Sequence, residues 1–117
     1  MNYLKKRIAA FSFAFKGIFY LFSHESHAII HLFAAVVVIV GGFLFRINAI
    51  EWCIISICIG SVFMAEAFNT AIEKLADKIS LDKDPLIGIA KDLSAGAVLL
   101  FSISTIIVAA IIFIPKF

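Results

Sequence analysis

The segment Met64-Ala-Glu-Ala-Phe-Asn-Thr-Ala-Ile-Glu-Lys-Leu-Ala-Asp77 begins inside an apolar run and leaves it carrying acidic side chains. At about 100° per residue on a helix, its polar members fall within one narrow arc, opposite an apolar face. These polar residues are Glu66, Asn69, Thr70, Glu73 and Asp77. The segment therefore predicts one helix that starts in a hydrocarbon environment, ends in water and carries a single polar face.

Glu66 occupies the most costly position in this segment. No formally charged residue lies between Glu51 and Glu66, so we expect its carboxylate at or just inside the hydrocarbon edge. An acid at such a depth costs roughly 2.5–3.5 kcal/mol on insertion scales, and such residues usually face a protein interior and mark function. Glu73 follows about 10 Å further along the helix axis. A deep carboxylate and a shallow one on the same face suit chemistry between a lipid headgroup and a water-soluble reagent.

The composition of the 117 residues is that of a membrane protein. The chain is 63% hydrophobic and 15% charged, with a mean hydropathy of +1.11, whereas soluble domains average about 45–50% apolar and 25% charged residues. Its length predicts a single domain, residues 1–117. The net charge of +2 is too small to indicate nucleic-acid binding, and Cys53 and Cys58 lie in an apolar run without a metal-binding or disulfide pattern.

An all-α integral membrane fold with four helical segments follows from the hydropathy pattern. Residues 2–23 mix basic side chains with phenylalanines, as in an amphipathic helix that lies on a membrane surface. Transmembrane spans are predicted at about 28–45, 49–68 and 93–114, since 18 helical residues rise about 27 Å. The second helix continues to Ile79, and a loop over residues 80–85 precedes the third span because Asp84 stands before a proline.

The basic residues predict how these spans are oriented. In a three-span arrangement eight of them lie on one side of the membrane (Lys5, Lys6, Arg7, Lys16, Lys74, Lys78, Lys83 and Lys91), and Arg46 and Lys116 lie on the other. Basic residues concentrate on the cytoplasmic side. We therefore expect a multi-pass protein of the inner or plasma membrane, with its N-terminus and candidate site in the cytoplasm, where ATP is available, and its C-terminus outside.

The chain lacks both common glycine-rich phosphate loops, so a triphosphate would have to be held by a metal ion on carboxylates together with a lysine. Both kinds of group stand at the mouths of the spans: Glu25 at the first, Glu73 at the second and Lys91-Asp92 at the third. Mg²⁺ usually binds one or two carboxylates plus substrate phosphates. These residues therefore predict a Mg²⁺–nucleotide site.

Two other groups of polar residues receive simpler interpretations. Lys74, Asp77 and Lys78 are expected to form local ion pairs on a solvated helix face. His24, His27 and His31 have the i, i+3, i+7 spacing of one helix face, and a transition-metal site is one interpretation of that spacing. We favour the other interpretation, in which the histidines contact water and lipid headgroups.

With these residues in place, the chain resembles the prokaryotic diacylglycerol kinase family of small, trimeric, three-span lipid kinases. The resemblance rests on Glu66-Ala-Phe-Asn-Thr-Ala-Ile-Glu73 with Asp77, and on Ala90-Lys-Asp-Leu-Ser-Ala-Gly-Ala-Val98, together with Lys16-Gly17 and Glu25. It covers nearly the whole chain. Ile50-Glu-Trp52 and the ending Ile114-Pro-Lys-Phe117 are more similar to the undecaprenol kinase branch of the family.

The resemblance implies an ATP-dependent kinase that transfers the γ-phosphoryl group of Mg-ATP to a membrane lipid alcohol, undecaprenol or, as the alternative, diacylglycerol. Glu66 matches the general base that contacts the lipid hydroxyl. Glu25 and Glu73 match ligands of the Mg²⁺ that accompanies ATP. The other residues that match nucleotide-binding positions are Asn69, Lys91 and Asp92, with Asp82, Lys83 and Asp84 matched more weakly. A homotrimer is also implied.

A non-catalytic membrane protein is the alternative from another class. A small channel or metal transporter would use the three histidines and Glu66. A transporter places ionisable residues near the middle of its spans, in cavities between helices. The central turns of the predicted spans carry no acidic or basic residue, so we prefer the lipid kinase.

Overall fold

The computed structural model describes residues 2–79 and 84–117 and has four α-helices in this part of the chain. They are α1 (Tyr3–His24), α2 (Ser26–Leu44), α3 (Ala49–Ile79) and α4 (Pro85–Phe113), and a 3₁₀ turn (Ile114–Lys116) follows α4. Three helical segments are long and apolar enough to cross a membrane: Ser26–Leu44, Ala49–Ile79 and Pro85–Lys116. The prediction of an all-α fold with three candidate spans is confirmed.

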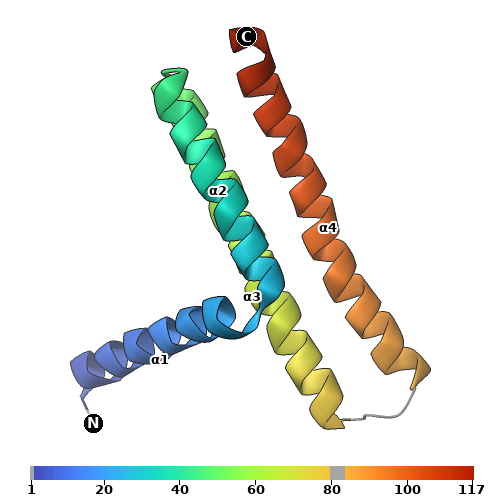
Figure 1. Cartoon of the computed structure of the whole chain (residues 1–117). Helices are drawn as coiled ribbons and strands as arrows, with labels where there is room; N and C mark the ends of the chain where they lie inside the picture. Colours follow the sequence, from blue (N-terminus) through green and yellow to red (C-terminus); the bar gives the residue numbers. More distant parts are fainter. Residues whose placement is uncertain (1, 80–83) are drawn as a thin grey trace.

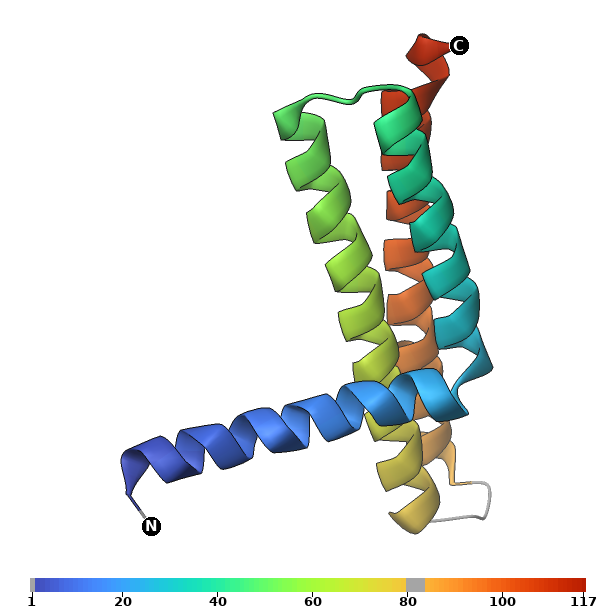
Figure 2. The same cartoon turned by 60° about the vertical axis from the view of Figure 1, so that its left-hand side comes forward.

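Helices α2, α3 and α4 form an elongated bundle, and α1 projects from its side (Figure 1). The most extensive contacts join α3 to α4. Helix α1 meets the bundle only near its junction with α2, and Leu21 is its one buried residue. Figure 2 shows that α3 and α4 continue past the level of α1. The acidic half of α3 and the start of α4 therefore form one end of the bundle.

Local chemistry explains where the helices near this end begin. The Asp84 carboxylate caps α4, because its Oδ1 accepts the backbone N–H groups of Leu86 at 2.9 Å and Ile87 at 3.3 Å. Pro85 takes the first helical position, where its missing N–H has no intrahelical acceptor to lose. Glu25 has an extended backbone and stands between α1 and α2. Its side chain is therefore placed where the projecting helix joins the bundle.

The opposite end of the bundle contains its apolar core. Ile47, Ile55 and Ile112 are buried there, with Trp52 among the residues packed against them. A Cβ atom on Gly42 would lie 2.6 Å from Cη2 of Trp52, so only glycine lets this ring pack closely on α2. The short turn between α2 and α3 requires a left-handed backbone at Arg46, whose φ is 52°. The core and this turn hold α2 and α3 side by side.

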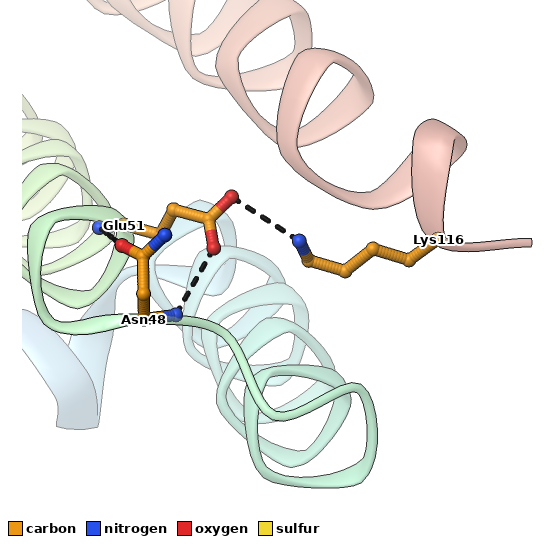
Figure 3. A network of polar contacts seen from close by, with 3 residues as sticks. All are labelled: Asn48, Glu51 and Lys116. Carbon is orange, nitrogen blue, oxygen red and sulfur yellow. Dashed lines mark hydrogen bonds and ion pairs between the residues drawn. The ribbon is translucent and has the colours of Figure 1, made fainter.

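A network of polar contacts lies at the same end of the bundle (Figure 3). The backbone N–H of Asn48 donates to Glu51 Oε1 at 3.0 Å, and that of Glu51 donates to Asn48 Oδ1 at 2.9 Å. This reciprocal pair caps the first turn of α3. Lys116 Nζ lies 3.3 Å from the second Glu51 oxygen, Oε2. The network thus ties the end of the chain to the start of α3, far from the acidic residues at the other end.

Candidate active site

A buried stripe on α3 contains the residue that the sequence marks as most costly. Val62, Glu66 and Thr70 are spaced four residues apart and are all buried, so one face of the helix points into the protein. Glu66 is only 4% exposed. An ionised carboxylate at such a position needs a polar partner, because removing it from water without one is strongly unfavourable.

The partner of Glu66 is His31 on α2. The two side chains approach with Nε2 of His31 3.1 Å from Oε1 of Glu66. For His31, the interpretation that the histidines contact only water and headgroups is therefore wrong. His24 instead stacks on Tyr20 of its own helix. Within residues 2–79 and 84–117, no group of three or more His, Cys, Asp or Glu side chains is placed to hold a metal ion, so the three histidines form no such site.

A pattern in the sequence could have predicted that His31 lies on the packed face of α2. It lies three residues after Ala28 and four before Ala35, and both alanines are buried. Small residues at these spacings mark the helix face that can approach a neighbour most closely in a membrane protein. The histidine between them therefore belongs to the packed face of α2.

A second contact joins α3 to α4. The hydroxyl of Ser94 donates to Oδ1 of Asn69 at 2.8 Å, and Ser94 is buried. This bond orients the Asn69 amide, a candidate nucleotide contact, and leaves its NH₂ group to bind a further acceptor. Ser94 belongs to the segment of residues 90–98 that carries the family resemblance, but its contact with Asn69 depends on how α3 and α4 pack.

Asp77 and Lys91 form a third contact between these helices. Nζ of Lys91 lies 2.6 Å from Oδ1 of Asp77. The expectation that Asp77 forms only local ion pairs with Lys74 and Lys78 is therefore wrong, because its partner comes from α4. Exposed ion pairs add little to stability, and these side chains are 51% and 39% exposed. The consequence of this pair is positional, since it holds the Lys91 ammonium at the acidic end of α3.

Glu25 and Glu73 are the candidate magnesium ligands. Asp77 raises the pKa of the Lys91 ammonium, and the charge of Glu73 contributes in the same direction. Tyr20 raises the pKa of Lys74, the next residue after Glu73, and the charge of Glu25 adds a smaller effect. In the part of the chain that the structure describes, no side-chain hydrogen bond or ion pair occupies either carboxylate. Two uncommitted carboxylates near a lysine fit Mg²⁺, which takes its remaining ligands from substrate phosphates and water.

The other candidate nucleotide residues are less informative. Asp92 is exposed on the first turns of α4, and Asp84 is engaged as the α4 cap through one oxygen. Asp82 and Lys83 lie outside the described residues.

An apolar groove of about 610 Å³ lies between α1 and α3. Its lining includes Gly17 and Leu21 of α1 and Phe63 and Ala67 of α3, and Lys74 is its charged lining residue. The groove therefore offers apolar contact along most of its wall and a cationic group at the acidic half of α3. Such a surface suits an amphipathic ligand with an apolar chain and an anionic or polar head.

Comparison with known proteins identifies the family. The model of the family described as prokaryotic diacylglycerol kinase matches residues 12–113. The chain belongs to the prokaryotic diacylglycerol kinase family. This kinase is 39% identical over 115 residues to the undecaprenol kinase of Bacillus subtilis, an alignment that covers 98% of this chain and 94% of the relative. It is 33% identical over 109 residues to the diacylglycerol kinase of a Synechocystis species, covering 92% of this chain and 62% of the relative.

The enzyme class predicted from the sequence is thereby confirmed. The chain is a lipid kinase, a phosphotransferase that acts on an alcohol group. The alternative of a channel or metal transporter is not favoured, since the family and both relatives are kinases. In this kinase, the contacts from His31, Ser94 and Asp77 orient three of the residues that the sequence marked for chemistry or for ligand binding.

Proposed function

We propose that this kinase transfers the γ-phosphoryl group of ATP to the hydroxyl of undecaprenol. The observation that carries the proposal is the buried Glu66 carboxylate, which contacts His31 through one oxygen. Within the described residues the other oxygen has no polar protein partner. A relative that aligns with 98% of this chain is an undecaprenol kinase, which supports undecaprenol over diacylglycerol as the acceptor.

Glu66 is the general base of the proposed reaction. Its carboxylate takes the proton of the lipid hydroxyl as the hydroxyl oxygen attacks the γ-phosphorus, and ADP leaves with its bridging oxygen. Phosphoryl transfer depends mainly on positioning and on neutralising charge. The depth of Glu66 matches an acceptor whose hydroxyl lies at the membrane boundary, and the groove between α1 and α3 would take part of its apolar chain.

The residues near the acidic end of α3 would hold the nucleotide. Glu25 and Glu73 would bind Mg²⁺, which neutralises phosphate charge when bound. Asn69, Lys91 and Asp92 would contact ATP, and the loop residues Asp82, Lys83 and Asp84 are weaker candidates. The bond from Ser94 to Asn69 and the ion pair from Asp77 to Lys91 support these roles, because they fix the two side chains before a ligand binds.

The site also suggests a membrane arrangement and an assembly. The chain would form one lipid-kinase domain in the inner or plasma membrane, with α1 lying along the cytoplasmic surface and the C-terminus outside. The excess of basic residues on the side of α1 and the acidic end of α3 supports this orientation. A homotrimer would cover apolar faces of the bundle and complete sites between protomers.

An acceptor panel tests this function. The purified chain in detergent, with Mg-ATP, is given undecaprenol or diacylglycerol at equal mole fraction, and the phosphorylated lipid is measured. We expect kcat/KM to favour undecaprenol by about 10-fold or more, as differences in apolar contacts allow. The reverse order would assign diacylglycerol as the acceptor. If neither lipid gives a phosphorylated product, the proposed reaction is refuted.

A further inference from the structure

We propose that His31 is the positioning residue of the kinase, holding the Glu66 carboxylate in the orientation that receives the lipid proton. This inference rests on the proposed role of Glu66 as general base. Its central observation is the 3.1 Å approach between Nε2 of His31 and Oε1 of Glu66. The two residues lie on different helices, so the contact exists only because α2 and α3 pack together.

The packing of α2 against α3 brings the side chains of His31 and Glu66 together. On α2, the buried residues Ala28 and Ala35 flank His31 on the same helix face. Their small side chains let the backbone of α2 come close to α3. On α3, Glu66 stands in the middle of the stripe formed with Val62 and Thr70, each one turn away. Each member of the pair is thus placed at the centre of a packed face.

His31 is the only basic side chain of the described residues within 4.0 Å of the Glu66 carboxylate. Two lysines at the acidic end of α3 contact other groups: Lys91 pairs with Asp77, and Nζ of Lys74 lies 5.6 Å from the centre of the Tyr20 ring. Because an unpaired carboxylate is costly to bury, the imidazole is the group that makes the position of Glu66 tolerable.

In this geometry the two oxygens of the Glu66 carboxylate have different roles. Nε2 of His31 lies 3.1 Å from Oε1, so a neutral imidazole with its proton on Nε2 is within reach to donate to that oxygen, and we assign this tautomer from the contact. Oε2 is then left to take the hydroxyl proton. His31 keeps its own proton throughout and touches neither the phosphate nor the lipid. Its contribution is orientation, and a misplacement of about 1 Å in an active site can cost about 10²-fold in rate.

Substitutions at His31 test this role, with His27 as the matched control. His27 lies on the same helix, one turn earlier, and is exposed. We expect His31→Ala to lower kcat by about 10–10²-fold while the KM for ATP stays near its parental value, because the nucleotide binds elsewhere. His31→Gln should recover most of the loss, since its amide can still donate to Glu66. His27→Ala should behave like the parent.

A double variant separates action through Glu66 from any other effect. If His31 acts by orienting Glu66, then His31→Ala/Glu66→Gln should be no slower than Glu66→Gln alone. If His31→Ala does not fold, the double variant should regain the fold, because the buried charge has been removed. A double variant that stays unfolded would show a packing role and overturn the proposal.

The remaining outcomes are equally decisive. The proposal is overturned if His31→Ala keeps the parental kcat, if His31→Gln is as slow as His31→Ala, or if the two losses multiply in the double variant. In these cases, if the Glu66→Gln protein is slow, the proposed role of Glu66 as general base still stands and only the role of His31 is lost. A fast Glu66→Gln protein would instead remove the general base, and with it both proposals.

Discussion

A Glu66→Gln variant should phosphorylate its lipid about 10²–10⁴-fold more slowly than the parent, the usual contribution of a general base. Glutamine keeps the size of the side chain and can still accept a hydrogen bond from His31, but it cannot take a proton. The affinity for ATP should change little, because the candidate nucleotide residues lie further along α3 and on α4. Stability should equal or exceed that of the parent, since a buried charge is removed.

Three measurements check this result: kcat from the phosphorylated lipid, the dissociation constant for ATP, and the thermal transition. Glu51→Gln is the matched control, because it makes the same change at the other end of α3 and its amide oxygen can still accept the Asn48 N–H. The control should retain the parental kcat. A Glu66→Gln protein that works at close to the parental rate would remove Glu66 as the base, and one that loses ATP binding would assign Glu66 to the nucleotide.

Glu25→Ala and Glu73→Ala should each move the magnesium concentration for half-maximal activity upward. We expect a shift of about 10–100-fold, because even residues that only support a metal ligand change metal affinity by that amount. Each substitution removes a carboxylate that has no hydrogen bond or ion pair with another side chain in residues 2–79 and 84–117. The rate is measured against total Mg²⁺ at a fixed, saturating concentration of ATP.

The same Glu51→Gln control should leave the magnesium curve unchanged. If Glu25→Ala or Glu73→Ala keeps both the parental rate and the parental magnesium dependence, that residue is not a ligand. A loss of rate at every magnesium concentration without a shift in the midpoint would instead indicate a different role, such as holding the neighbouring lysine.

Hydropathy and periodicity predict the helices of this chain because those properties depend on neighbours along one segment. The acids of α3 are an example: the apolar run before Glu66 and the 3.6-residue repeat are enough to predict a helix with one polar face that leaves the membrane. The start of α4 is predicted less well: the sequence places Pro85 in the loop, whereas the structure begins the helix at Pro85 behind the Asp84 cap.

The contacts between helices were beyond this kind of reasoning. Asn69 and Ser94 are 25 residues apart, and Asp77 and Lys91 are 14 apart, so their meeting depends on the rotation and depth at which α3 and α4 pack. The sequence favours nearby lysines as partners of Asp77, because helical ion pairs at short spacing are common. The prediction that His31 contacts water is wrong because Ala28 and Ala35 mark its side of α2 as the packed face.

In the proposed reaction, the chain moves the γ-phosphoryl group of ATP to a lipid hydroxyl with Glu66 as the base. Its most direct test follows ATP labelled at the γ-phosphate, with purified protein, Mg²⁺ and undecaprenol, and compares labelled lipid with ADP formed. We predict equal amounts of labelled lipid and ADP from the parent, and background amounts of both from Glu66→Gln. ADP formed without labelled lipid, or labelled lipid at the parental rate from Glu66→Gln, would contradict this proposal.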